Sequence, residues 1–222
     1  MRFWGLLEGR TGLKIAILGS GNVGASLGTH WAQAGHQVVF GSRDPGSAKV
    51  QEILCRVNPA MCAELPHVSV QDAEVIVLAV PWPQAEGVLK SLGDLSGRIV
   101  IDCTNPLKPD LSGLETHGGP AAAEQIAAWA PGARIVKAFN TASTRVMRDP
   151  KFDSQQATMF YCGDDPEAKR VVHDLIAQVG FEPVDAGSLA HAHYLESLAM
   201  LYIHLAVKLG WGSNCAFKIL KR

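Results

Sequence analysis

One glycine-rich segment has the residue types and the spacing needed to hold a diphosphate. It follows an apolar run directly and opens an amphipathic one, which favours a binding loop over a glycine-rich turn without a ligand. In such a GxGxxG segment the first glycine permits a tight turn, the second lets a diphosphate approach the backbone, and the third lets helix pack on strand. The amide groups and dipole at the helix start favour the negative charge. A dinucleotide-binding loop is therefore predicted over Gly19, Ser20, Gly21, Asn22, Val23 and Gly24.

The segment after the next predicted strand bears on which dinucleotide is bound. An NAD site places Asp or Glu about twenty residues after the glycines, where it accepts hydrogen bonds from the ribose hydroxyls. Here, Ser42 can donate to a 2′-phosphate and Arg43 can pair with it through two N–H groups, with Lys49 one helical turn further on. We therefore expect NADP(H). In the alternative interpretation, Arg43 is a solvated cation and Asp44 is the carboxylate of an NAD site.

Three more loops follow predicted strands. Ligands of open α/β sheets bind beyond the carboxyl ends of the strands, so these loops should face the nicotinamide, which backbone carbonyls and amide side chains can anchor. The residues expected there are Val80, Pro81, Asn105, Asn140 and Thr141. Pro81 and Pro106 are equally well interpreted as strand terminators, a role compatible with lining the site. Trp82 is more typical of a core aromatic than of a pocket wall.

No residue pattern indicates an acid–base pair or a metal site. The chain has no HExxH motif and no zinc-type spacing of Cys and His. His191 and His193 would diverge on a helix, Asp102 is interpreted as a strand-end residue, and His204 as a core or interface histidine. We expect no catalytic side chain and no metal. This absence favours an acceptor that takes a hydride with little proton transfer from the protein, such as a flavin-like ring.

Strand and helix signals alternate along the chain, which predicts an α/β fold: a Rossmann-type doubly wound, mostly parallel sheet with a small C-terminal α/β extension. Residues 13–145 are predicted to form the NADP-binding domain. Residues 146–222 are predicted to extend the sheet and to cover the acceptor site. Strands are expected over 14–19, 37–40, 67–70, 74–80, 98–102, 134–139, 157–162 and 181–185. Helices are expected over 22–34, 48–57, 121–130, 166–179 and 191–209.

The composition excludes several classes of partner. With 20 Lys+Arg against 21 Asp+Glu, the formal charge is −1, which argues against nucleic acid or an acidic membrane as the main partner. The longest apolar stretch, 198–207, is shorter than the roughly 18 residues of a membrane helix. Five cysteines without a CxxC pair indicate reduced thiols and a cytoplasmic location. A charged fraction of only 18% and an apolar last helix favour a homodimer through that helix.

Taken together, seven stretches resemble the coenzyme F420-dependent NADP oxidoreductase family, and equally the cytoplasmic reductase domain of the six-transmembrane ferric reductases. The resemblance extends over 14–209, nearly the whole chain. The stretches are 17–24 (ILGSGNVG), 41–45 (GSRDP), 78–82 (LAVPW), 105–106 (NP), 137–141 (KAFNT), 161–169 (YCGDDPEAK) and 185–189 (DAGSL).

The resemblance implies a small-molecule redox acceptor, namely F420, FMN or FAD, lying against the nicotinamide of NADPH. It implies that Ser20, Gly21, Asn22 and Val23 hold the diphosphate, that Ser42 and Arg43 hold the 2′-phosphate, that Val80 and Pro81 flank the nicotinamide, and that Asn140, Thr141 and 189–195 lie near the acceptor. Hydride would then pass directly from nicotinamide C4 to the acceptor ring.

Three departures from the family pattern bear on these expectations. Asn140 stands where F420 reductases tend to have His, and His193 stands where an Arg can serve the anionic deazaflavin. The link over 69–74 is too short for the usual helix. Two alternatives stay open: an imine reductase of the pyrroline-5-carboxylate reductase type, against which the short remainder of the chain counts, and an NADP-binding redox sensor without turnover.

Overall fold

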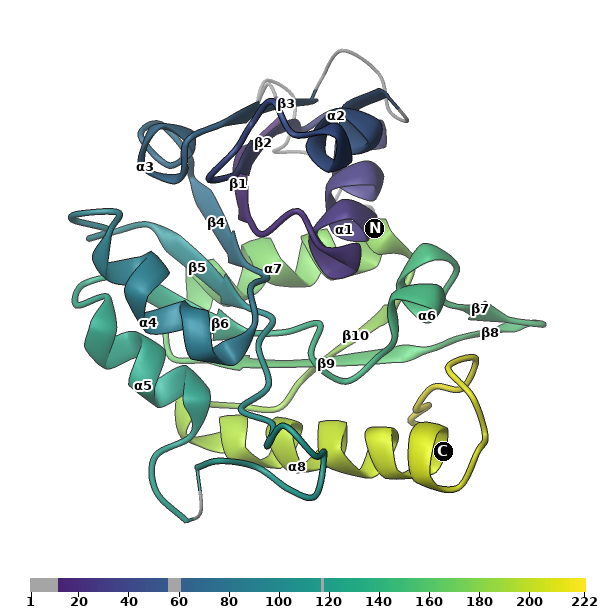
Figure 1. Cartoon of the computed structure of the whole chain (residues 1–222). Coiled ribbons are helices and arrows are strands. Elements are labelled where there is room, and N and C mark those ends of the chain that lie inside the picture. The colour runs from purple at the N-terminus through teal and green to yellow at the C-terminus, as the bar shows by residue number, and fades with distance from the viewer. Residues whose placement is uncertain (1–11, 56–60, 117) are drawn as a thin grey trace, which may run out of the picture.

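The computed structural model describes residues 12–55, 61–116 and 118–222. Within these ranges an eight-stranded sheet forms the centre of the molecule, in the order β10-β9-β6-β5-β4-β1-β2-β3 (Figure 1). The strands are β1 (Lys14–Leu18), β2 (Gln37–Gly41), β3 (Met61–Glu64), β4 (Val75–Leu78), β5 (Ile99–Asp102), β6 (Arg134–Lys137), β9 (Thr158–Gly163) and β10 (Glu182–Asp185). The six from β3 to β6 are parallel, β9 is antiparallel to β6, and β10 is parallel to β9. The predicted Rossmann-type α/β fold is confirmed.

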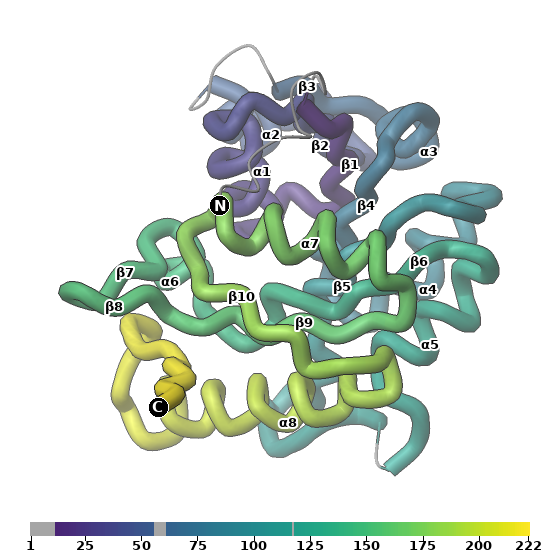
Figure 2. The backbone as a smooth tube through the Cα atoms, turned by 180° about the vertical axis from the view of Figure 1, so that it is seen from behind, coloured from purple at the N-terminus to yellow at the C-terminus, as the bar shows by residue number. Residues whose placement is uncertain are grey.

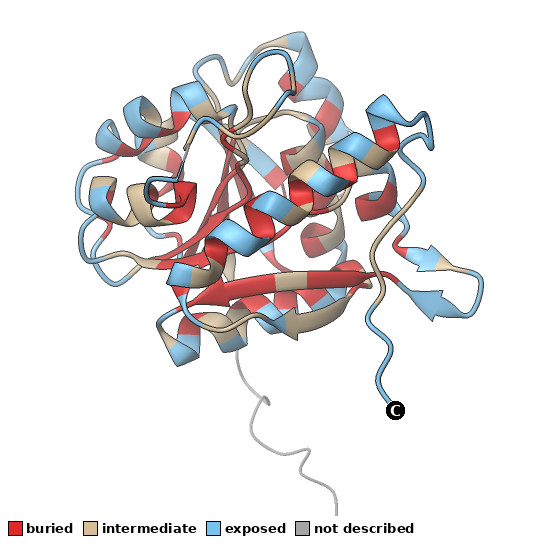
Figure 3. Ribbon diagram, turned by 90° about the horizontal axis from the view of Figure 1, so that it is seen from below, coloured by how far each residue is buried: buried red, intermediate tan, exposed pale blue. Residues whose placement is uncertain are grey.

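Helices cover both faces of the sheet because the parallel strands bury side chains on both sides. In β1, Ile15 and Ile17 join one hydrophobic cluster and Ala16 and Leu18 the other, with the period of two that a strand imposes. Seen from below, the strands are buried between helices that expose only their outer sides (Figure 3). One face carries α1 (Asn22–Gln33), α2 (Ala48–Cys55), α6 (Thr144–Arg148) and α7 (Pro166–Val179); the other carries α4 (Trp82–Lys90), α5 (Ala122–Trp129) and α8 (Ala192–Ile203).

The prediction of a strand over 67–70 is wrong. The third strand is β3, earlier in the chain, and Pro66–Ser69 forms the single helical turn α3 beside β2. The alternation of Val68 and Val70 imitates a strand, whereas Pro66 occupies the first turn of a helix, where its missing N–H costs nothing. The link between the third and fourth strands therefore covers residues 65–74 rather than 69–74, and the only helix in it is this single turn. The helix expected over 48–57 is α2, and its last two expected residues lie outside the described ranges.

Helix α4 was not expected, because Pro81 was interpreted as a strand terminator that can line the site and Pro83 as a further stop, neither as the start of a helix. Pro81 precedes the helix and Pro83 lies in its first turn, where proline is tolerated. The long helix expected over 191–209 is divided into a 3₁₀ turn, η1 (Leu189–His191), then α8, then a π-helical turn, η2 (His204–Lys208). No helix among the described residues combines the length and apolar character needed to span a bilayer.

The final residues fold back onto the start of β9. The amide of Thr158 donates to the carbonyl of Phe217 at 2.8 Å, and the amide of Ile219 donates to Thr158 Oγ1 at 3.0 Å. Near them, β7 (Lys151–Phe152) and β8 (Gln155–Gln156) form a short hairpin. Figure 2 shows this end of the chain beside the far end of α8. On α8, Tyr202 packs inward near Phe217, whereas Leu201 is exposed, as is Trp211 beyond the end of the helix.

Candidate functional site

The glycine loop joins the end of β1 to the start of α1, and two of its glycines are required by close backbone contacts. Gly19 has φ +114°, and a Cβ there would lie 2.4 Å from the carbonyl oxygen of Ala79. A Cβ on Gly24 would lie 2.2 Å from the carbonyl oxygen of Gly19. Gly19 therefore makes the tight turn, and Gly24 lets α1 approach the strand, as the motif predicts.

Gly21 differs from its two neighbours in the motif because it faces open space. Apart from Gly21 and its two chain neighbours, no atom of the described residues lies within 4 Å of the position that its Cβ would take. It is the residue before α1, so no side chain caps the first amides of that helix. Uncapped amides at a helix start, beside a space that a side chain would fill, match the shape and charge of a diphosphate.

The glycine loop opens into a cavity of about 420 Å³. Among the described residues, this cavity brings together the end of β1, the turn after β2 and the start of α4. The predicted residues that line it are Gly19, Ser20, Gly21, Ser42, Arg43, Lys49, Val80 and Pro81. The predicted residues Asn22, Val23, Gly24, Asn105, Asn140 and Thr141 are not in its lining. Lining residues that the sequence did not suggest include Pro66, Gln84 and Val88, which come from α3 and α4, the two helices that were not expected.

At one side of the cavity, a turn stabilised by hydroxyl groups presents two cations. Ser42 Oγ donates to the carbonyl oxygen of Asp44 at 3.0 Å, and Ser47 Oγ donates to the same oxygen at 2.9 Å. Arg43 and Lys49 are exposed, and neither has an ion pair or side-chain hydrogen bond with any other described residue. Both cations are therefore available to an anionic ligand. Asp44, the carboxylate of the NAD alternative, lines the same cavity.

The loops after β5 and β6 hold each other through two asparagines. Asn105 Nδ2 donates to the carbonyl oxygen of Asn140 at 2.9 Å, and Asn140 Nδ2 donates to Asn105 Oδ1 at 3.0 Å. Asn140 Nδ2 also donates to the carbonyl oxygen of Leu195 on α8 at 3.0 Å. The preceding residue, Phe139, has φ +62°, a strained value for a residue with a side chain. The buried Thr141 hydroxyl contacts Met159 Sδ at 3.7 Å.

A buried charge cluster lies directly behind these loops. Lys137, Asp102 and Glu196 are all 0% exposed, and Lys137 Nζ lies 2.7 Å from Asp102 Oδ2 and 3.2 Å from Glu196 Oε1. Burial opposes the charge on Lys137, but the negative charges of Asp102 and Glu196 outweigh it and raise the lysine pKa above its usual 10.5. This cluster was not predicted from the sequence. Its signal was a lysine within a strand predicted to be buried on both faces, which demands a partner.

The two cysteines at the ends of β5 and β9 are buried thiols. Burial raises the pKa of Cys103 well above its usual range, and the charge of Asp102 adds to this effect. Burial also raises the pKa of Cys162 to about 12, against the opposing charge of Lys137. Both thiols are therefore protonated at neutral pH and are poor nucleophiles. Within the described ranges, no group of three or more His, Cys, Asp or Glu residues could hold a metal ion.

Comparison with known proteins gives three informative matches. Metalloreductase STEAP3 of Rattus norvegicus is 33% identical over 189 residues, which are 84% of this chain but only 36% of the metalloreductase, so the chain spans about a third of that relative. The F420-dependent NADP reductase of Methanothermobacter marburgensis is 29% identical over 88% of this chain and 93% of its own length. The crystal structure of a putative F420-dependent NADP-reductase from Arthrobacter sp. FB24 is 30% identical and superposes with a TM-score of 0.85, covering 95% of this chain and all of that one.

The family model described as NADP oxidoreductase, coenzyme F420-dependent, matches residues 14–106, from β1 through β5 to the loop that contains Asn105. The Arthrobacter structure extends the likeness over the rest of the sheet and α8. The chain therefore belongs to the family of coenzyme F420-dependent NADP oxidoreductases.

Proposed function

We propose that this chain binds NADPH in the cavity beside Gly21 and catalyses direct hydride transfer from its nicotinamide to a flavin-type acceptor, F420, FMN or FAD. The observation that carries the proposal is the convergence of two separate sequence signals on one cavity. The glycine loop after β1 and the cations Arg43 and Lys49 after β2 line the same space. NADP(H) carries both a diphosphate and a 2′-phosphate, so one molecule of this coenzyme can bind to the glycine loop and to the two cations at the same time.

Different residues bind the two phosphate groups of the coenzyme. The uncapped amides at the start of α1 bind the diphosphate, for which Gly21 leaves room. Arg43 and Lys49 bind the 2′-phosphate, since both are exposed and lack a partner among the described residues. The hydroxyl of Ser42 keeps their turn in shape through Asp44. This arrangement favours NADPH over NADH.

The nicotinamide end of the site is built from the other loops. Val80 and Pro81 line the cavity at the end of β4. Bound NADPH would supply a hydride from C4 of its nicotinamide ring. The amide side chains of Asn105 and Asn140 stand between the sheet and α8, and they orient the reacting rings rather than transfer protons. The acceptor lies between the loop after β6 and α8. A deazaflavin is supported by the two relatives named as F420-dependent reductases.

Titration and hydride-transfer assays test the proposal in sequence. Isothermal titration calorimetry should detect NADPH binding that is tighter than NADH binding. NADPH oxidation should then be followed optically with F420, FMN and FAD, and with a cyclic imine as a fourth acceptor. Transfer above background to one of the three flavin-type acceptors supports the proposal. Binding without transfer to any acceptor favours the redox sensor, turnover of the imine alone favours an imine reductase, and no NADPH binding would refute the coenzyme site.

A further inference from the structure

We propose that Lys137, Asp102 and Glu196 are positioning residues for the hydride acceptor. They act through a closed chain of polar contacts, here called the circuit, that joins the loops after β5 and β6 to α8. Its other members are Thr104, Asn105, Asn140 and the carbonyl group of Leu195. The inference rests on the proposed hydride transfer, and it assigns a role to a buried cluster that coenzyme binding leaves unexplained.

The first half of the circuit fixes the loop after β5. Asp102 Oδ1 accepts hydrogen bonds from the amide of Thr104 at 2.8 Å and from Thr104 Oγ1 at 2.7 Å. Lys137 Nζ donates to the carbonyl oxygen of Thr104 at 2.9 Å and to Asp102 Oδ2 at 2.7 Å. Both backbone polar groups of Thr104 and its hydroxyl are therefore held by the Lys137–Asp102 pair, and this sets the direction in which the chain enters Asn105.

The second half runs through the asparagines and returns along α8. Asn105 and Asn140 exchange two hydrogen bonds, and Asn140 Nδ2 donates to the carbonyl oxygen of Leu195. The next residue on α8 is Glu196, whose Oε1 lies 3.2 Å from Lys137 Nζ and closes the circuit. Apart from this contact with Lys137, neither carboxylate oxygen of Glu196 has a hydrogen-bond partner among the described residues, so Lys137 is its main attachment to the sheet.

Stability alone is a poor reason for such a cluster. Removing three side chains with charge from water costs free energy, and a buried ion pair is often matched or exceeded in stability by apolar residues of similar volume. A fully buried ion pair, however, resists separation of its charges, because separation would leave an unpaired charge away from water. Lys137 thus holds α8 at one place along β6, beside the asparagines that would face the acceptor.

The coenzyme cavity is separate from this circuit. None of its described lining residues is Lys137, Asp102, Thr104, Asn140 or Glu196. Disturbing the circuit should therefore change the site of the acceptor and leave the residues that bind the diphosphate and the 2′-phosphate, which dominate NADPH affinity, unchanged. A general loss of structure would change both.

The test compares two substitutions at Glu196. Glu196→Gln keeps a side-chain oxygen that can accept a hydrogen bond from Lys137, whereas Glu196→Leu keeps the volume but loses the contact. We expect the Leu variant to raise the acceptor KM by about fivefold or more, with kcat at saturating acceptor and the NADPH Kd each within about twofold of wild type. The Gln variant should restore an acceptor KM close to that of wild type. The exposed Glu167 on α7 provides the control, because Glu167→Leu should change none of these constants.

A second variant covers the case in which Glu196→Leu does not fold. Thr104→Val keeps the shape of this buried residue and removes only the hydroxyl contact to Asp102, so it should raise the acceptor KM in the same direction by a smaller factor. The inference is overturned if both variants keep the wild-type acceptor KM, if NADPH Kd rises in parallel with it, or if Gln and Leu at 196 behave alike. If the wild-type protein transfers no hydride, the proposed function itself fails and this inference falls with it.

Discussion

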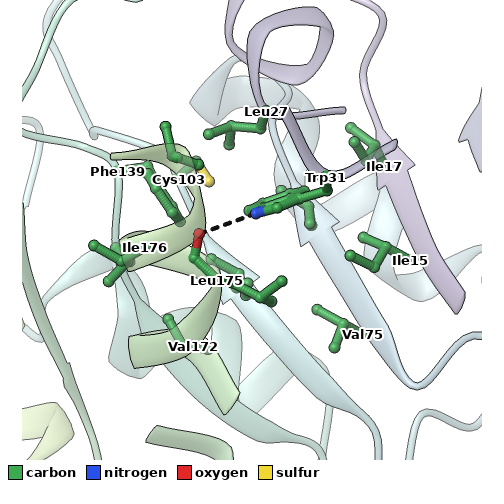
Figure 4. Close-up of a cluster of buried hydrophobic side chains, with 14 of the residues drawn as sticks. Ile15, Ile17, Leu27, Trp31, Val75, Cys103, Phe139, Val172, Leu175 and Ile176 are labelled. Carbon is green, nitrogen blue, oxygen red and sulfur yellow. Dashed lines mark hydrogen bonds between the residues drawn. The ribbon is translucent and has the colours of Figure 1, made fainter. Parts of the chain in front are cut away.

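The indole N–H of Trp31 in α1 donates to the carbonyl oxygen of Leu175 in α7 at 3.0 Å, across 144 residues of sequence (Figure 4). Trp31 is fully buried, and its ring meets Phe139 edge-on at a centroid distance of 5.8 Å. The helix that begins at the glycine loop is thus fixed to a helix from the last third of the chain. The glycine loop and α7 should therefore lose their structure in one transition.

Trp31→Phe tests this coupling. The substitution removes the indole donor and part of the ring volume, so we expect the free energy of unfolding to fall by about 1–3 kcal/mol. Urea denaturation followed by circular dichroism should still show a single transition, at lower urea. NADPH affinity should change little, because Trp31 is not in the lining of the cavity. Two separated transitions, in the variant or in the wild type, would contradict the coupling.

Substitution by alanine should lower NADPH affinity at Gly21 and thermal stability at Gly24. At Gly21 the new methyl group enters open space, so stability should change by less than about 1 kcal/mol while NADPH affinity falls by about tenfold or more. At Gly24 the methyl group would collide with the Gly19 carbonyl, so the melting temperature should fall markedly. Thermal melts and calorimetric titrations of both variants provide the measurement. An unchanged NADPH Kd in Gly21→Ala would place the diphosphate elsewhere.

Arg43→Ala addresses the choice of coenzyme. If Arg43 binds the 2′-phosphate, its loss should raise the NADPH KM by about tenfold and leave the NADH KM within about twofold. Asp44→Ala is the matched variant, since it removes the neighbouring carboxylate of the same turn. We expect Asp44→Ala to leave the NADPH KM close to its wild-type value. A selective loss of NADH use in Asp44→Ala, with equal losses for both coenzymes in Arg43→Ala, would favour the NAD interpretation.

Much of the fold could be predicted because local patterns and tertiary packing agree. The apolar run of β1, the glycine loop and the amphipathic α1 each point to the same βαβ unit. Errors arose where one local pattern is compatible with two structures. Val68 and Val70 alternate as in a strand although they lie at a helical turn, and Pro83 lies in the first turn of α4 although proline after an apolar run is also typical of a strand end.

The candidate site also has a part that could be predicted from the sequence and a part that could not. The phosphate-binding part depends on residues close in sequence to a motif, so its lining was largely predicted. The circuit behind Asn140 depends on contacts between residues far apart, such as Lys137 with Glu196, and no short motif encodes them. A buried lysine in a predicted core strand signals that some partner exists. It does not identify that partner as a glutamate on the last helix.

The buried lysine also predicts a pH dependence of stability. The pKa of Lys137 in the folded protein is raised above its usual 10.5, so its contribution is fully present below that pH and is lost as pH rises through the folded value. Glu196→Gln removes one of the two charges that raise this pKa, so the loss should begin at lower pH in the variant. Urea unfolding from about pH 9 upward measures the difference. Tyr161 and Tyr202, whose pKa values are also raised by burial, affect both proteins alike and cancel in the comparison. Burial and, to a smaller extent, Glu196 raise the pKa of Cys162, so both proteins should carry Cys162→Ala to remove its contribution. Identical pH profiles for the two proteins would show that Glu196 exerts no electrostatic influence on Lys137.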